Sequence, residues 1–265
     1  MIKRILAAAI FLWLAVECSA AEKTIKIQTT LPWLESMARF IVGATAEINS
    51  ISWWTDAGTL RSPRRIARDM PTIALDPRDA VSFGFKNGGV SLLYENLPVS
   101  DGSKGEIPFD PSILPFLSQR MLIVLSRLLP DNYPFFQRKL AEFQSRLEST
   151  LEVGRSLIGD VHILDLTGAI SPWIRAADDG AVRPPEDLWA AWSDGKRTEE
   201  LVKVIEEANK RTWWILTDAW TPAPVRARTQ SMAMSIVISP PPRDYAFFSY
   251  LHDIYLEIWA ASTAQ

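Results

Sequence analysis

The sequence predicts an α/β fold of two lobes, each a mainly parallel sheet with flanking helices, joined by a long backbone helix. Strand-like and helix-like segments alternate over residues 24–94, as they do in parallel sheets covered by helices. The same alternation starts again near residue 161 and continues to residue 261. Between these halves, residues 133–157 form an unbroken amphipathic segment that would be about 35 Å long as a helix.

The chain opens on a segment with the features of a leader. Lys3 and Arg4 precede an apolar run over residues 5–16, and small residues follow before Ala21. This order is typical of a secretory signal peptide, so we expect residues 1–20 to be cleaved and the mature chain to be periplasmic or otherwise exported, and soluble. The alternative is an uncleaved anchor, against which the short apolar run argues.

Composition narrows the class of protein. The single cysteine among the 265 residues lies in the leader, so the mature chain has neither a disulfide nor a thiolate ligand. Loss of the leader leaves 26 basic and 30 acidic side chains, a net charge of −4. This mild acidity argues against a partner that is a nucleic acid, because such binding requires a basic footprint.

The first lobe, residues 21–110, begins with the alternating β-branched segment 24–30, which is typical of a strand. Pro32 suits the first turn of the helix expected next, over residues 31–42. The other elements expected here are strands at 46–54, 72–75, 80–83 and 90–94, a short basic helix at 60–69 and a loop at 101–105.

Residues 111–158 are expected to link the lobes. A first helix spans residues 111–129 and is apolar on most faces, and Pro130 with the two residues after it ends that helix. The second helix, residues 133–157, is expected to be continuous and to touch both lobes. It carries a stripe of apolar side chains at helical spacing: Phe136, Leu140, Phe143, Leu147 and Leu151.

The second lobe, residues 159–265, repeats the alternation of strands and helices. The stretch 178–194 is expected to be loop-rich because it contains Gly180 and the pair Pro184-Pro185. The elements expected here are strands at 161–166, 212–216 and 232–238, and helices at 169–177, 198–210, 224–231 and 245–261.

Four pieces of the chain follow one another in a familiar order. They are TIKIQTTLPWLESMARFIVG, the pair Asp110-Pro111, LLPDNYPFFQRKLAEFQSRLESTL and IVISPPPRDYAFFSYLHDIYLEIWAA. In this order the chain resembles the TroA-like, or cluster A-I, periplasmic solute-binding proteins of metal ABC transporters, over nearly all of its mature length. The resemblance implies a protein that is not an enzyme. It implies one that captures a metal, a metal complex or a small solute between two lobes and delivers it to an ABC permease at the inner membrane.

The sequence departs from that family at the metal site. The resemblance implies a zinc or manganese site of three histidines and one carboxylate. The matching positions hold no histidine: residues 56–60, Glu106, Thr167 with Gly168, and Ser239. We therefore expect no tight zinc site of the family type and no certain cofactor. A divalent metal remains an alternative, because Asp56, Glu106 and Asp218 are weak candidates for an all-oxygen site.

The cleft between the lobes is the expected ligand site, and aromatic walls suit an organic solute. The two histidines are expected to be packing and surface residues respectively, His162 in a strand and His252 on the last helix. The residues expected to line the cleft are Thr30, Trp54, Asp56, Glu106, Thr167, Trp173, Asp218, Trp220 and Ser239.

A rival hypothesis is that the protein has this fold but has lost the metal site. A degenerate member would act as an accessory protein without a metal and would bind a partner through exposed tryptophans. The pairs Trp53-Trp54 and Trp213-Trp214 are candidates, because neighbours on a strand point to opposite faces. An enzyme is the least favoured reading, since the sequence has no G-x-S-x-G and no H-E-x-x-H motif.

Overall fold

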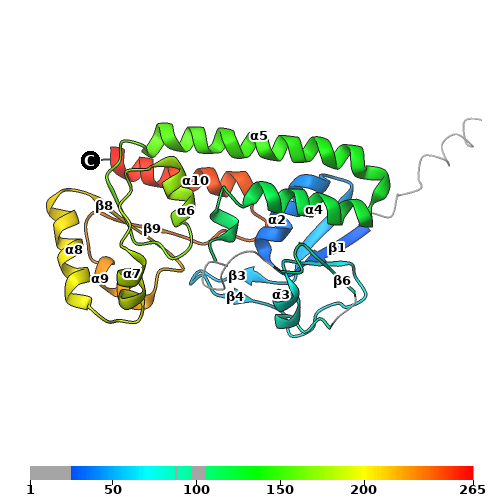
Figure 1. Ribbon diagram of the computed structural model, residues 1–265, viewed down its shortest axis with the longest axis horizontal. Helices are drawn as coiled ribbons and strands as arrows, with labels where there is room; N and C mark the ends of the chain where they lie inside the picture. Colours follow the sequence, from blue (N-terminus) through cyan, green and yellow to red (C-terminus); the bar gives the residue numbers. More distant parts are fainter. Residues whose placement is uncertain (1–24, 87–88, 97–104, 265) are drawn as a thin grey trace, which may run out of the picture.

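The computed structural model describes residues 25–86, 89–96 and 105–264. The predicted leader, residues 1–20, and most of the predicted loop at 101–105 lie outside this part of the chain. The described elements build two lobes, and one long helix runs along both (Figure 1). This arrangement confirms the fold class that the sequence predicts.

The first lobe holds a parallel sheet of four strands in the order β2-β1-β5-β6. Helix α2 (Pro32–Val42) packs against β1 and β2, and its proline lies in the first turn as expected. The alternate side chains Ile27 and Ile48 are paired in register and buried in the core. The strands are β1 (Ile25–Thr29), β2 (Ala46–Ser50), β5 (Thr72–Ala74) and β6 (Val90–Leu92).

Two predictions for the region after β2 are wrong. The strand expected at 46–54 is interrupted after Ser50, and its end forms a separate strand, β3 (Trp53–Trp54). The helix expected at 60–69 does not form, because β4 (Leu60–Arg61) pairs with β3 in an antiparallel hairpin. Pro63 also disfavours a helical conformation for the residue before it.

The strand expected at 80–83 is also wrong, because these residues belong to helix α3 (Pro77–Ser82) and its end. The Asp76 carboxylate accepts a hydrogen bond from the Asp79 backbone N–H at 2.7 Å, and Pro77 occupies the first helical position. An aspartate cap followed by proline is a helix-start signal that outweighs the short apolar run.

The linking region follows the prediction closely. It contains η3 (Ile107–Phe109), α4 (Leu114–Leu128), η4 (Pro130–Asn132) and α5 (Tyr133–Ile158). Helix α5 is 26 residues long and continuous, and it contacts α2 and α4 from the first half of the chain and α6 and α10 from the second half. Its predicted stripe is buried at Phe136, Phe143 and Leu147.

The second lobe holds a parallel sheet of three strands in the order β7-β8-β9. The loop-rich stretch expected at 178–194 is wrong in part, because Glu186–Ser193 form helix α7. The prolines before it end the preceding loop, and acidic residues in its first turn favour the helix start. The elements of this lobe are β7 (Ile163–Asp165), β8 (Trp214–Asp218), β9 (Ser235–Ile238), α6 (Ser171–Ala177), α7, α8 (Thr198–Lys210), α9 (Ala223–Thr229) and α10 (Phe247–Thr263).

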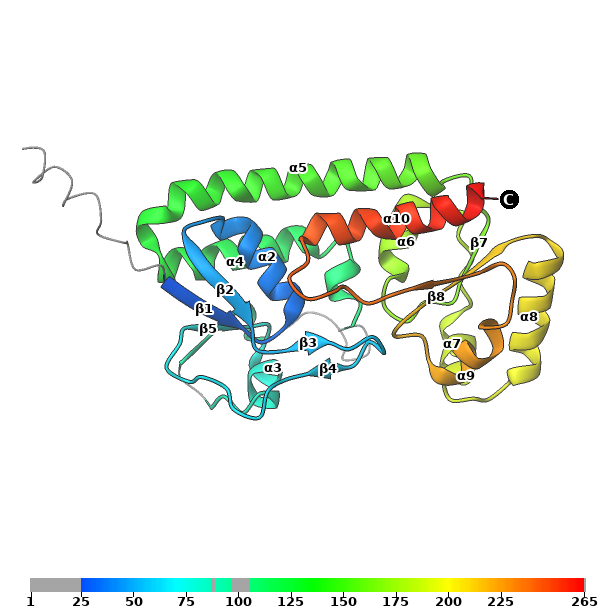
Figure 2. The same cartoon turned by 180° about the vertical axis from the view of Figure 1, so that it is seen from behind.

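A shared hydrophobic core extends through both lobes along α5 and α10, which lie side by side in Figures 1 and 2. The contact is close at Gly154 of α5, where a Cβ atom would lie 2.3 Å from the ring of Tyr255 in α10. Helix α10 also contacts α2 of the first lobe. The chain therefore crosses between the lobes three times: through α5, through residues 239–246, and back along α10 (Figure 2).

No helix in the described part of the chain combines the length and the apolar composition that a membrane crossing requires.

Candidate functional site

Three aromatic rings occupy the space between the lobes. Trp54 of β3 meets Trp220, which follows β8, edge to face with ring centroids 5.4 Å apart. Phe109 of η3 also packs against Trp220, with ring centroids 5.4 Å apart. We call Trp54, Phe109 and Trp220 the interlobe junction. The hairpin β3-β4 reaches toward the second lobe here (Figure 2).

The tip of this hairpin fits closely against the second lobe. Gly58 has a φ of +70°, a conformation that favours glycine, and a Cβ atom there would lie 3.0 Å from the Ala219 carbonyl oxygen. Within the second lobe, a Cβ atom on Gly168 would lie 2.2 Å from the Trp220 carbonyl oxygen, so the loops after β7 and β8 also pack closely at the junction. The junction is therefore closed by main-chain contacts as well as by rings.

Asp218, which the sequence suggests as a metal ligand, is fully buried at the end of β8 and already has its hydrogen-bond partners. Its two oxygens accept bonds of 2.8 to 3.2 Å from five donors, namely the backbone N–H groups of Gly168, Ala169, Ile170 and Trp220 and the hydroxyl of Thr221. A carboxylate offers about four lone-pair sites, so these donors saturate it. Asp218 anchors the segment that leads into α6.

A second buried carboxylate lies nearby. Asp165 at the end of β7 accepts hydrogen bonds from the backbone N–H and hydroxyl of Thr167, at 3.0 and 2.6 Å. Arg183 reaches the Asp165 carboxylate at 3.5 Å and Glu106 at 4.0 Å. Burial raises the pKa of Glu106, and Arg183 opposes that shift. Glu106 is thus joined to the second lobe through Arg183.

The other residues expected in the cleft lie elsewhere. Trp173 is fully buried in the core, where it stacks on Tyr255 at 5.4 Å and donates its indole N–H to the Leu251 carbonyl at 3.0 Å. Thr30 is buried and donates its hydroxyl to Asp79. The remaining two, Asp56 and Ser239, are exposed.

The histidines differ from expectation in one respect. His162, expected to be packed in a strand, is exposed just before β7, with its ring 6.0 Å from that of Trp213. His252 on α10 is partly exposed. Within residues 25–86, 89–96 and 105–264, no group of three or more histidine, cysteine, aspartate or glutamate side chains has an arrangement that could hold a metal ion. The residues at the family positions therefore do not fit a four-ligand zinc site.

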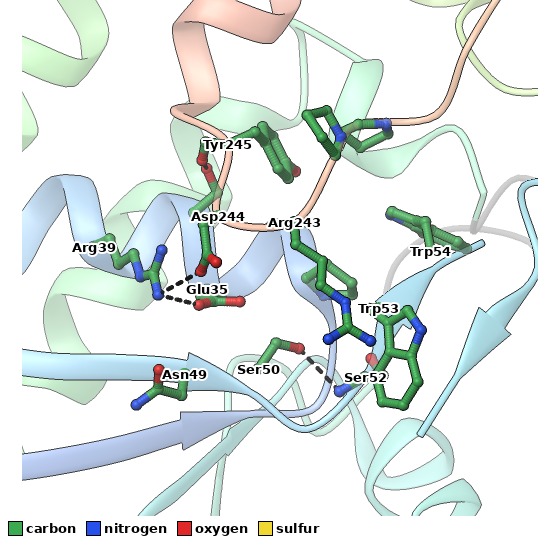
Figure 3. Close-up of a pocket in the computed structure, with 14 residues that line it drawn as sticks. Glu35, Arg39, Asn49, Ser50, Ser52, Trp53, Trp54, Arg243, Asp244 and Tyr245 are labelled. Atoms are coloured by element: carbon green, nitrogen blue, oxygen red, sulfur yellow. Dashed lines mark hydrogen bonds and ion pairs between the residues drawn. The ribbon is translucent and has the colours of Figure 1, made fainter. Parts of the chain in front are cut away.

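A polar cavity of about 150 Å³ lies beside the junction, at the carboxyl ends of β1 and β2. In open α/β sheets this edge is where ligands bind. The cavity lies between α2, β3 and the segment that precedes α10 (Figure 3). Its charged residues are Glu35, Arg39, Arg243 and Asp244, and we call it the Arg243 pocket.

One arginine serves two carboxylates on one side of this pocket. Glu35 and Arg39 lie one turn apart on α2, and Arg39 Nη2 is 2.6 Å from Glu35 Oε1. The same nitrogen is 3.0 Å from Asp244 Oδ1, and Arg39 Nε donates to the Ile48 carbonyl at 3.0 Å. Burial raises the pKa of Glu35, although Arg39 favours its ionised form.

Arg243 lies on the other side of the pocket. Its guanidinium carbon is 4.1 Å from the centroid of the Trp53 ring. Pro241 and Pro242 restrict the backbone before it, and Asp244 after it has a φ of +59°, so the chain turns sharply here. In the part of the chain that the structure describes, no carboxylate forms an ion pair with Arg243.

The sequence analysis did not single out the four charged residues of this pocket. Two local signals were present: a glutamate four residues before an arginine on a predicted helix, and the run Pro240–Pro242 directly before Arg243 and Asp244. Neither signal shows that the two segments meet, because Ser36 and Tyr245 are 209 positions apart in the sequence. Their approach is recorded by the hydrogen bond from the Ser36 hydroxyl to the Tyr245 carbonyl at 2.9 Å.

Solved structures share this fold. A crystal structure of ZnuA superposes with a TM-score of 0.67 at 14% identity, over 91% of this chain and 100% of that one. A Zn(II)-bound variant of AdcAII from Streptococcus pneumoniae gives 0.62 at 11% identity, over 89% and 99%. A Mn-bound periplasmic metal binding protein from Candidatus Liberibacter asiaticus gives 0.61 at 9% identity, over 89% and 99%. No protein-family model matches the sequence, and no curated protein matches it either.

Proposed function

We propose that this chain is a solute-binding protein of the TroA-like kind, exported by its leader, which captures a small solute and delivers it to an ABC permease at the inner membrane. The observation that carries this proposal is the architecture: two parallel sheets joined by one continuous 26-residue helix, as in the ZnuA-like structures. The proposed units are residues 21–110, 111–158 and 159–265. A helix-joined pair of lobes suits capture of a ligand with small closure motions, and no catalytic role is proposed.

The cargo is not proposed to be zinc held in the manner of the family. A tetrahedral zinc site needs about four converging nitrogen, sulfur or oxygen ligands. Asp218 is saturated by hydrogen bonds, and Thr167 donates to Asp165. The cargo classes that remain are a metal complex and a small organic solute.

The rival function, an accessory protein that binds no metal, is favoured by one observation. Trp54, Trp220 and Phe109 pack together between the lobes, where the family would hold its metal. On this hypothesis the protein acts through its surface.

A solute screen tests the proposal. Tag-free mature protein is stripped with a chelator and then assayed for thermal stability with zinc, manganese, metal complexes and small organic solutes. A ligand at a hundred times its dissociation constant should stabilise the folded state by about 2.7 kcal/mol. A stabilising solute supports the solute-binding function, whereas a screen without any such solute supports the accessory protein.

Calorimetry with zinc tests whether the cargo is the free metal ion that the resemblance implies, instead of a metal complex or a small organic solute. We expect no tight, stoichiometric binding. Sub-micromolar binding at one site that His162→Ala or His252→Ala abolishes would show that a histidine site exists and that the proposed cargo is wrong.

A further inference from the structure

We propose that the Arg243 pocket binds a small zwitterion, whose carboxylate meets Arg243 and whose ammonium group meets Glu35 and Asp244. This inference rests on the proposed solute-binding function and names the class of the solute. The site differs from the metal position that the resemblance implies, which is expected near the interlobe junction.

The anionic end of the ligand is argued from Arg243. Its guanidinium lies over the Trp53 ring at 4.1 Å, and in Figure 3 it is seen beside Trp53 and Ser52 at the pocket. Stacking on an aromatic face holds the planar group in place and leaves its N–H edge free for hydrogen bonds. That edge matches a carboxylate in a bidentate arrangement. Among the described residues no carboxylate satisfies it, so a ligand carboxylate is its natural partner.

The cationic end is argued from the opposite side of the pocket. Arg39 Nη2 serves both Glu35 at 2.6 Å and Asp244 at 3.0 Å, so one positive charge faces two negative charges. The Glu35 side chain is only 13% exposed, which strengthens its attraction for a cation that enters the pocket. An ammonium group is a compact charge with three donors and can be shared by two carboxylates.

Charge balance favours a zwitterion over a simple ion. The pocket contains two arginines and two acidic residues, and so carries no net charge. A bare metal cation would leave Arg243 without a partner, and a simple anion would leave the excess carboxylate without one. A ligand with both charges provides a partner for Arg243 and for the acidic residues, and the occupied pocket stays neutral.

The volume limits the size of the ligand. A cavity of about 150 Å³ in another protein accommodates benzene, a molecule of about six heavy atoms. The Arg243 pocket has the same volume, about 150 Å³. Its ligand is therefore the size of a small amino acid such as alanine or proline.

Calorimetry with L-alanine and L-proline tests the inference on tag-free mature protein. We expect saturable one-to-one binding in the millimolar range or tighter. Acetate and methylammonium, each of which carries one of the two charged groups, should bind at least about tenfold more weakly than L-alanine, because each loses one charge-assisted contact.

Substitutions locate the two ends of the ligand. Arg243→Gln and Glu35→Gln should each weaken L-alanine binding by about tenfold or more, and Arg243→Lys should weaken it less than Arg243→Gln. Arg211→Gln is the matched control, because Arg211 also lies over a tryptophan, Trp213, at 5.6 Å, but in the other lobe. The control should bind like the wild type.

Three results would overturn the inference: no heat from either amino acid at millimolar concentration, wild-type affinity in Arg243→Gln, or acetate that binds as tightly as L-alanine. If these results appear while another solute stabilises the protein in the screen above, the zwitterion is wrong and the solute-binding function stands. If no solute binds at all, both fail.

Discussion

The interlobe junction and the Arg243 pocket both collect polar and aromatic residues at the carboxyl ends of parallel strands, but they differ in how far their polar groups are satisfied. At the junction, Asp218 accepts five hydrogen bonds and the rings of Trp54 and Trp220 fill the space. In the pocket, Arg39 is shared by two carboxylates, whereas Arg243 lies over the face of Trp53 and has no ion pair with a carboxylate among the described residues. A saturated buried carboxylate has no lone pairs left for a ligand, whereas an arginine without an ion pair keeps its donors available, and this difference favours the pocket.

The largest expected effect is at Asp218. Asp218→Ala should lower the free energy of unfolding by about 3–5 kcal/mol, because several buried donors lose their acceptor together. Urea unfolding measures the change. Asp56→Ala is the control, since Asp56 was an equal candidate from sequence but is exposed, and it should shift stability by less than about 0.5 kcal/mol. Equal effects in the two variants would contradict the structural role of Asp218.

A second substitution tests the close packing of the junction. Gly168→Ala would place a methyl group 2.2 Å from the Trp220 carbonyl oxygen, which belongs to the backbone and cannot rotate away. We expect a loss of about 1–3 kcal/mol in the same urea assay. Gly105→Ala is the control, because a Cβ atom there meets nothing within 4 Å. A neutral Gly168→Ala would show that the loops after β7 and β8 are not in firm contact here.

In the Arg243 pocket, by contrast, we expect a substitution that raises the free energy of unfolding. Burial raises the pKa of Glu35 above its ordinary value of 4.5, so folding favours the protonated carboxyl. Its ionised form costs stability, and the cost appears as the pH rises through the folded-state pKa. Glu35→Gln should therefore stabilise the protein at neutral pH by up to about 1 kcal/mol.

The pH dependence provides the check. Below the ordinary pKa, the wild-type carboxyl is protonated in both the folded and the unfolded state, so the advantage of Glu35→Gln should disappear in acid. Urea unfolding at a series of pH values measures it. A variant that is less stable than the wild type at neutral pH would show that the Arg39 ion pair outweighs burial.

The smallest expected effect on stability is at Arg243. Arg243→Gln removes an exposed cation from the face of Trp53 and should cost about 0.5 kcal/mol. Thermal unfolding without ligand measures it. A loss several times larger would mean that Arg243 holds the segment before α10 in place, and its effect on ligand affinity would then be structural.

The same contrast explains what the sequence could predict. The stripe on residues 133–157 predicts α5 almost to the residue, because burial on one face of a long helix leaves a periodic pattern. Short elements were less predictable: Ala80 and its neighbours look like a strand, but the Asp76 cap starts a helix there. Local chemistry decides such segments when the apolar run is brief.

The candidate site was harder to predict from the sequence than the short helices and strands. Sequence shows that Asp218 ends a strand, but not that five donors converge on it. It shows that Trp173 is aromatic, but not that its indole N–H is satisfied by Leu251 in the core. The Arg243 pocket joins α2 to a segment about 200 residues later, and no local pattern records a contact over that distance.

Tryptophan resonances offer the most direct test, because each region contains its own reporter: Trp53 in the pocket and Trp220 at the junction. Mature protein labelled with ¹⁵N at the tryptophan indoles, with assignments from Trp53→Phe and Trp220→Phe, is titrated with L-alanine and followed by NMR. We expect the Trp53 indole signal to move in a saturable manner while the Trp220 signal stays in place. Movement of Trp220 without Trp53, or no movement of either, would contradict the claim that the pocket, and not the junction, receives the solute.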